Sequence, residues 1–160
     1  VKQGGGFTLG GVAPDRYVIA LAGMPENYYL KSARYGDRSW TDHTVEISAP
    51  LAPFAIIVAD DAATITGSVR DEKGEPVQGA YVVLVDKAQR RGRNRSVRSD
   101  ERGAFRITGV EPGDYSAFAA SDVDPGAIDD ADYLKPWMSS ATSTKADSRG
   151  QSALSLTLKP

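Results

Sequence analysis

The sequence contains no cysteine, which excludes disulfide bonds, thiolate metal sites and cysteine nucleophiles together. It has no apolar run near the ~20 residues that a membrane-spanning helix needs, and residues 1–10 lack the pattern of a signal peptide. Because the chain begins with Val1 rather than methionine, we expect it to be a mature or excised piece of a longer protein.

Histidine and net charge are also scarce. His43 is the single histidine, so a transition-metal site is not expected. Ser39 and Asp42 lie beside it, but neighbours in sequence do not make a catalytic triad, and no nucleophile elbow accompanies them. We interpret His43 as a surface histidine in a loop. The formal net charge of -2 favours no nucleic-acid partner.

The sequence also lacks a clear helical periodicity, and it contains short segments that alternate as β-strands do. Residues 64–69 alternate, a tight turn follows at 71–74, and 81–85 is a β-rich run. A polar, arginine-rich loop spans 87–98, and a second turn spans 99–103. Frequent glycine and proline between short strands indicate a β-sandwich.

The chain repeats itself internally. Residues 7–17 and 105–115 share Phe, an apolar residue, Gly, Val, Pro and Tyr at the same spacing. Two further matches follow in the same order: Tyr29-Leu30-Lys31 with Tyr133-Leu134-Lys135, and Phe54, Ile56 and Val58 with Leu154, Leu156 and Leu158.

The repeated motif predicts a β-hairpin in each copy. Phe105 begins one strand, Glu111 to Asp114 form a turn with Gly113 at positive φ, and Tyr115 begins the return strand. Phe and Tyr would then enter one core. Asp15 replaces this glycine in the first copy, so we expect a slightly strained turn there.

The two copies differ in length. The boundary lies near residues 60–62, and about 40 residues precede Phe105 in the second copy, whereas only six precede Phe7 in the first. Three explanations remain open: the chain is a fragment, the missing strands come from another chain, or the first copy is a reduced sheet that packs on the second.

The second copy carries motifs of a known family. They are Gly67-Ser68-Val69-Arg70-Asp71, Gly74-Glu75-Pro76-Val77, Gly79-Ala80-Tyr81-Val82, Ser99-Asp100, Gly103-Ala104-Phe105 and Val110-Glu111-Pro112-Gly113-Asp114-Tyr115. With them the chain resembles the carboxypeptidase regulatory-like domain, strongly over residues 62–120. The resemblance implies a transthyretin-like, seven-stranded β-sandwich related to Cna B-type modules, used as an accessory, spacer or docking unit.

We therefore predict an all-β protein of two tandem Ig-like or transthyretin-like β-sandwich modules. Residues 1–60 would be the later part of an incomplete first module, and residues 61–160 a complete second one.

Three groups of side chains are candidates for binding. The acids of the segment 122–132 could hold Ca²⁺, although a solvated loop is favoured because the spacing is not that of an EF-hand. The loop arginines could bind an anionic partner, although a flexible hairpin tip is favoured. Four aromatic residues could stack on sugars. The groups are Asp122, Asp124, Asp129, Asp130 and Asp132; Arg90, Arg91, Arg93, Arg95 and Arg98; and Trp40, Trp137, Tyr28 and Tyr35.

The predicted function is that of a non-catalytic structural or adhesive module of a bacterial surface, secreted or periplasmic protein. It would contact other chains, or copies of itself, through the open face of the first module. The alternative is a carbohydrate-binding accessory module with a starch-binding-like fold, taking polysaccharide. No nucleic acid, membrane span or obligatory cofactor is expected.

Overall fold

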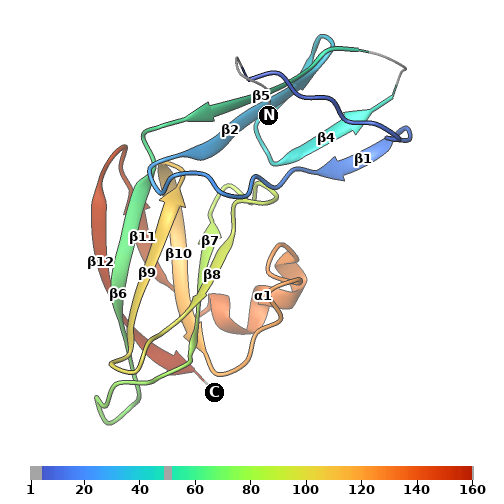
Figure 1. The fold of residues 1–160 in the computed structure, drawn as a ribbon. Helices are drawn as coiled ribbons and strands as arrows, with labels where there is room; N and C mark the ends of the chain where they lie inside the picture. The colour runs from blue at the N-terminus through green and yellow to red at the C-terminus, as the bar shows by residue number, and fades with distance from the viewer. Residues whose placement is uncertain (1–4, 49–51, 160) are drawn as a thin grey trace.

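The structure is a computed structural model that describes residues 5–48 and 52–159, and it is almost entirely β (Figure 1). The prediction of an all-β protein is confirmed. The elements are β1 (Asp15–Val18), β2 (Tyr29–Tyr35), β3 (Arg38–Trp40), β4 (Thr44–Ile47), β5 (Phe54–Ala59), β6 (Ala63–Arg70), β7 (Tyr81–Asp86), β8 (Arg95–Arg98), β9 (Ala104–Val110), β10 (Gly113–Ala120), α1 (Ala131–Met138), β11 (Thr142–Ala146) and β12 (Gln151–Lys159).

Strands β6 to β12 form a sandwich, which we call the C-terminal sandwich (residues 63–159). The strands run in the order β8-β7-β10-β12-β6-β9, and β11 also pairs with β10. β10 and β12 share only the pairs Ala119–Leu158 and Ala120–Lys159, so the strands divide there into two layers. Both layers contribute to one core, including Ile65 of β6 and Leu84 of β7. The predicted sandwich is confirmed.

Two predicted turns of the sandwich are confirmed, and each is closed by an aspartate. The Asp71 carboxylate accepts hydrogen bonds from the backbone N–H groups of Lys73 and Glu75, both at 2.9 Å. Asp100 does the same for Arg102 and Ala104. Each turn also contains a glycine at positive φ, so local sequence chemistry suffices to form it.

The segment from Phe105 to Tyr115 is not the β-hairpin that the sequence predicted. β9 pairs with β6, whereas β10 pairs with β7 and β11, so the turn at 111–112 carries the chain from one layer to the other. Positive φ occurs at Gly109, at 65°, and not at Gly113. The prediction that Phe105 and Tyr115 enter one core is confirmed.

The helix α1 was not predicted. The Asp130 side chain caps it by accepting from the backbone N–H groups of Asp132 and Tyr133, and Leu134 buries its side chain against β7 and β10. Tyr133-Leu134-Lys135 is therefore helical, whereas Tyr29-Leu30-Lys31 lies in β2. The predicted equivalence of these two triplets is wrong, because one segment packs as a helix and the other pairs as a strand.

Strands β1 to β5 form two small sheets, which we call the N-terminal sheets (residues 15–59). β1 pairs with β4, and β2 lies between β3 and β5. Residues 7–14 form no strand, so the hairpin predicted there is also wrong; the Phe7 ring instead meets the Phe54 ring edge-on, with centroids 5.7 Å apart. Asp15 begins β1 without positive φ, which removes the reason for strain.

Two tyrosines make the same contact in the two parts of the chain. The Tyr17 hydroxyl donates to the carbonyl oxygen of Ala13 at 2.9 Å, and the Tyr115 hydroxyl donates to that of Glu111 at 2.8 Å. Tyr17 lies in β1, which pairs antiparallel with β4, and Tyr115 lies near the start of β10, which pairs antiparallel with β11. A hydroxyl bond to the backbone upstream is the device of the tyrosine corner in Ig-like sandwiches.

The N-terminal sheets rest on one end of the C-terminal sandwich (Figure 1). Gly109 donates its N–H to the carbonyl oxygen of Glu26 at 2.9 Å, and Ala62 donates to that of Asn27 at 3.1 Å. Arg106 pairs with the Glu26 carboxylate at 2.8 Å. The connection between β5 and β6 is only residues 60–62 long, so the two parts are closely coupled.

Candidate functional site

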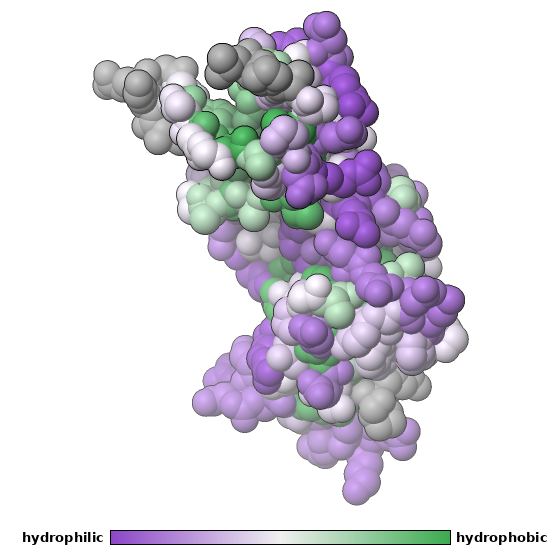
Figure 2. All heavy atoms as spheres, turned by 90° about the vertical axis from the view of Figure 1, so that its right-hand side faces the viewer, coloured by the Kyte–Doolittle hydropathy of each residue, from purple (hydrophilic) through white to green (hydrophobic). Residues whose placement is uncertain are grey.

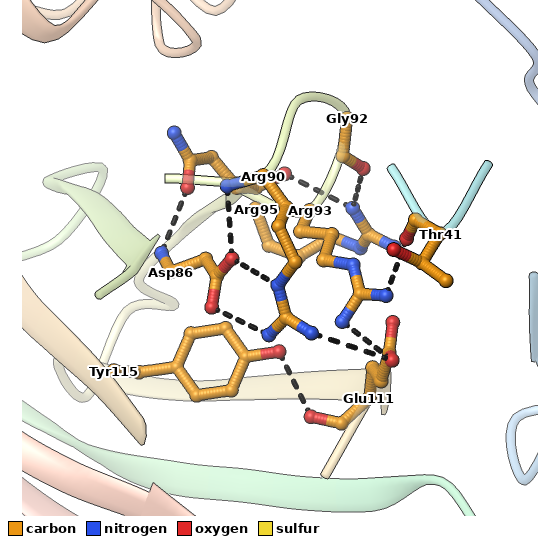
Figure 3. Close-up of polar contacts among 9 residues, drawn as sticks. Thr41, Asp86, Arg90, Gly92, Arg93, Arg95, Glu111 and Tyr115 are labelled. Atoms are coloured by element: carbon orange, nitrogen blue, oxygen red, sulfur yellow. Dashed lines mark hydrogen bonds and ion pairs between the residues drawn. The ribbon is translucent and has the colours of Figure 1, made fainter. Parts of the chain in front are cut away.

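The loop between β7 and β8 is held by a buried ion pair (Figure 3). Asp86 at the end of β7 is fully buried. Its carboxylate accepts from Arg90 Nε at 2.7 Å and Nη2 at 2.8 Å, and from the Arg90 backbone N–H at 3.0 Å. Burial raises the pKa of Asp86, but these bonds outweigh it and the net pKa is lowered. The loop is therefore anchored to the core.

A second buried pair joins this loop to the N-terminal sheets. Arg93, 3% exposed, lies 2.5 Å from a Glu111 carboxylate oxygen and also donates to the carbonyl oxygen of Thr41 at 2.5 Å (Figure 3). Burial raises the pKa of Glu111 against the opposing effect of Arg93 and Arg90. Burial, with Asp86 and Glu111 nearby, raises the pKa of Tyr115 to about 12. Arg93 thus links the Glu111 carboxylate of the C-terminal sandwich to the Thr41 carbonyl group between β3 and β4.

The arginines predicted to meet an anionic partner mostly face inward. Arg90 and Arg93 pair with internal acids, and the guanidinium of Arg98 lies over the Tyr81 ring at 4.1 Å from its centroid. Arg95 belongs to β8 and is half-buried, whereas Arg91 is exposed. The loop is a hairpin tip as expected, because β7 and β8 pair antiparallel, and its contacts with Asp86, Glu111 and Thr41 tether it.

A cavity of about 410 Å³ lies where the N-terminal sheets meet the C-terminal sandwich. The segment 18–26 forms much of its wall, and Tyr28 contributes to another part. His43 and Arg95 line it from opposite parts of the chain. We call it the junction cavity.

His43 is buried, at 7% exposure, and the prediction of a surface histidine is wrong. Its backbone N–H donates to the Arg91 carbonyl oxygen at 3.0 Å, which draws the residue into the junction. Burial, with repulsion by Arg95 and Arg93, lowers the pKa of His43 to about 4. The imidazole is therefore neutral at pH 7.

No catalytic triad forms around His43. The Ser39 hydroxyl donates to the carbonyl oxygen of Ala33 at 3.4 Å, and the Asp42 carboxylate accepts from the Thr44 hydroxyl at 2.9 Å. Both neighbours are thus directed to other groups.

The predicted calcium acids do not converge. Asp130 caps α1, Asp129 accepts from the backbone N–H of Gly92 at 3.0 Å, and Asp132 pairs with Lys135. Asp124 accepts from the backbone of Gly126 within its own turn, and Asp122 is exposed. Across residues 5–48 and 52–159, no group of three or more acidic or histidine side chains could hold a metal ion.

The aromatic candidates also separate. The Trp137 ring stacks on Phe118 at 5.5 Å and so supports α1. Trp40 is half-buried beneath the Arg38 guanidinium, at 5.3 Å from the ring centroid. Tyr28 lines the junction cavity, and the Tyr35 hydroxyl accepts from the Ala52 backbone N–H at 3.4 Å. The four rings form no common sugar-stacking platform.

Large exposed hydrophobic residues gather on the N-terminal part, where Figure 2 shows hydrophobic surface in its upper region. Of the seven in the described chain, only Met138 belongs to the C-terminal sandwich. A second hollow of about 630 Å³ opens beside this surface and is lined mainly by residues 7–14 with Tyr35 and Phe54. The six others, which we call the apolar face, are Phe7, Leu9, Val12, Val18, Ile57 and Val58.

The sequence analysis missed the roles of Asp86, Glu111 and Gly92. Asp86 ends an otherwise apolar run, which was a usable signal, because an acid there requires a partner once the strand is buried. Gly92 has a φ of 74°, and a Cβ on it would lie 2.5 Å from that of His43. Nothing in the local sequence marks that close approach.

Comparison with known proteins identifies one segment by sequence. Residues 64–123, under half of the chain, match the family model described as the carboxypeptidase regulatory-like domain. A search of the curated proteins finds no match. No helix in the described ranges has the length and apolar character to cross a membrane.

Solved structures with a similar arrangement include two pilins. The major pilin subunit BcpA of Bacillus cereus is 16% identical with a TM-score of 0.40, over 66% of this chain and 31% of that one. The streptococcal ancillary pilin is 14% identical with a TM-score of 0.40, over 84% and 45% respectively.

A putative carbohydrate-binding protein from Bacteroides uniformis is 15% identical with a TM-score of 0.37, over 59% of this chain and 40% of that one. The chain thus spans less than half of the length of each of these three proteins. At these TM-scores the likeness carries no argument about this chain.

Proposed function

The chain contains a carboxypeptidase regulatory-like domain at residues 64–123, and from this premise we propose that it is a non-catalytic structural or adhesive module of a bacterial surface, secreted or periplasmic protein. Its role is to bind other polypeptide chains, in the first instance copies of itself, through the apolar face. The observation that carries this proposal is the placement of the exposed hydrophobic residues. Six of the seven in the described chain lie on the N-terminal part, and three of them, Phe7, Leu9 and Val12, line an open hollow.

Strand pairing supports the same role. In the described residues, β5 hydrogen-bonds to β2 alone, so its other edge presents unpaired backbone groups. Ile57 and Val58 on this strand are 46% and 44% exposed. An apolar edge strand is suited to adding a strand from another chain.

We further propose that residues 1–60 are the later part of an incomplete sandwich module that precedes the C-terminal sandwich. The matching bonds of Tyr17 and Tyr115, and the matching antiparallel pairs β1–β4 and β10–β11, support this division. In the C-terminal sandwich the last strand, β12, pairs with the first strand, β6; in the N-terminal part the last strand, β5, pairs with β2 instead. The β2–β3 pair would therefore partly replace the front strands that this module lacks, and a partner chain would cover the rest.

Sedimentation velocity over a range of protein concentrations tests association. The wild-type chain should associate reversibly, and Leu9→Glu combined with Ile57→Lys should shift it towards monomer, because charges enter the apolar face. Met138→Glu is the matched control, since Met138 is the exposed hydrophobic residue outside that face. A monomer with a cooperative melt at every concentration would refute self-association.

The carbohydrate-binding alternative depends on Trp40, since the Trp137 ring of α1 is stacked on Phe118. It predicts quenching of Trp40 fluorescence by a polysaccharide, measured with Trp137→Phe so that one tryptophan reports. No response across a broad glycan panel would reject it.

A further inference from the structure

The junction cavity contains Arg95, a cation that Asp129 and Glu111 attract only from beyond ion-pair distance. Arg90 and Arg93 each have a carboxylate, Asp86 or Glu111, within ion-pair distance. Arg95 Nη1 donates only to the carbonyl oxygens of Gly92 at 2.7 Å and Asn94 at 3.0 Å, and no described acid lies within 4.0 Å of its guanidinium nitrogens. A half-buried guanidinium without a close carboxylate is stabilised when a further anion joins it.

The same cavity contains an unsatisfied histidine nitrogen. His43 is more than nine-tenths buried, and its Nε2 has no hydrogen-bond partner. Gly92 packs against Cβ, Cγ and Nδ1 of His43, which fixes one edge of the ring against the loop. Buried polar atoms are satisfied in nearly all native structures, so an orphaned nitrogen beside a cation without a close carboxylate indicates a site for a ligand that supplies both partners.

The rest of the wall sets the class of ligand. Leu21, Met24 and Pro25 line the cavity from the N-terminal part and offer an apolar surface. The volume of about 410 Å³ lies within the range of small-molecule sites. Glu26 also lines the cavity, but its carboxylate is paired with Arg106 at 2.8 Å. A cationic group beside an apolar part of the wall suits an anion with an aliphatic body better than a hydrated inorganic ion.

We propose that the junction cavity binds an aliphatic carboxylate, with its oxygens on Arg95 and His43 Nε2 and its apolar body against Leu21 and Met24. The imidazole also hydrogen-bonds to the Leu30 backbone, so donation from Nε2 to the carboxylate requires the ring to take up a second proton from solvent when the ligand binds. Arg93 and Asp129 are the other charged groups that act on this ring. The carboxylate belongs either to a small free acid or to the C-terminus of a peptide with an apolar last residue.

Binding is tested with the full chain by isothermal titration and by NMR of the single histidine. The probes are 4-methylpentanoate for a free acid, N-acetyl-leucine for a peptide C-terminus, N-acetyl-leucinamide as the neutral isostere and galacturonate as a polar acid. We expect saturable binding of at least one aliphatic acid, a shift of the His43 ring signals, and at least about tenfold weaker binding of the amide and of galacturonate. Preference between the two acids identifies the source.

The variant Arg95→Met should weaken binding at least about tenfold, whereas Arg91→Met, an exposed arginine of the same loop, should leave it unchanged. Without ligand, Arg95→Met should melt no lower than the wild type, because it removes a half-buried charge that has no close carboxylate. A purely structural Arg95 would instead lower the melting temperature. Arg95→Lys, which keeps the charge, should retain part of the binding.

Three results would overturn the proposal. They are no binding of either aliphatic acid up to about 10 mM, equal binding of the amide, or equal loss of binding in Arg91→Met. Leu9 and Ile57 do not line the junction cavity, so loss of self-association in Leu9→Glu, Ile57→Lys would leave this binding intact.

Discussion

At the residue scale, the molecule is organised by three inward arginines that differ in what compensates them. Arg90 pairs with the buried Asp86 and Arg93 with the half-buried Glu111, while Arg95 hydrogen-bonds to backbone carbonyl groups alone. Burying a charge is tolerated where a partner and hydrogen bonds replace water. The first two arginines are therefore expected to stabilise the fold, and the third to be available to a ligand.

Arg90→Leu should lower the free energy of unfolding by about 3 kcal/mol, because it leaves the fully buried Asp86 carboxylate without its cation. Urea denaturation at pH 7 measures the loss. Arg91→Leu is the control and should change stability by less than about 0.5 kcal/mol, because Arg91 is exposed. Equal stability of the two variants would mean that the pair contributes nothing.

His43 should make stability depend on pH. Its pKa is lowered to about 4 in the folded chain, so between pH 4 and the ordinary value near 6.5 only the unfolded chain binds this proton. Its contribution is therefore complete above pH 6.5 and is lost as the pH falls to 4, by about 3 kcal/mol. Urea midpoints at pH 7, 5.5 and 4 measure it.

In His43→Gln this part of the pH dependence should disappear. The acidic neighbours remain in the variant, so the difference between the two profiles isolates the histidine. An unchanged profile would contradict a buried neutral imidazole.

At the element scale, α1 covers the outer face of the layer that contains β7 and β10. Leu134 is its buried residue, and Trp137 stacks on Phe118 of β10. The helix thus builds a second apolar cluster on the side of the sheet away from the main core. An eight-residue helix is too short to be stable by itself, so this packing must maintain it.

Leu134→Ala should cost about 3 kcal/mol, since truncating a buried leucine removes apolar contacts and leaves a cavity. Lys135→Ala on the exposed side of α1 is the control. Thermal unfolding followed by circular dichroism measures both variants. Similar melting temperatures would show that α1 is dispensable for the sandwich.

At the scale of the whole molecule, the C-terminal sandwich contains most of the hydrophobic core and the N-terminal part contains little of it. Both apolar clusters consist of residues from Ala63 onward. The N-terminal part buries only a few hydrophobic residues, such as Leu30 and Val45, and exposes its apolar face. Its stability should therefore come from contact with the sandwich and from whatever covers that face.

Residues 61–160 expressed alone should fold and melt cooperatively, and residues 1–60 alone should not. Dispersion of amide signals in NMR spectra and thermal unfolding distinguish the outcomes. A folded 1–60 segment, or an unfolded 61–160 segment, would contradict this distribution of the core.

The sequence by itself determined the features that depend on near neighbours. The alternation of residues 64–69 predicts β6, and the β-rich run 81–85 predicts β7. Asp71 with Gly74, and Asp100 with Gly103, form turns through hydrogen bonds that span two to four residues. The family motifs are concentrated in the same region, which is why the sandwich was predictable. The sequence identified the candidate binding residues by their chemical type, but it did not predict whether each side chain faces the interior or the solvent.

The tertiary structure decided what those residues contact. Arg93 reaches Thr41 across 52 positions of sequence, and Gly92 excludes a side chain because His43 occupies that space. Likewise β9 and β10 alternate as a hairpin would, yet they pair with strands of different layers. Burial and pairing arise from contacts between distant segments, so the inward arginines, the buried histidine and the junction cavity follow only from the fold.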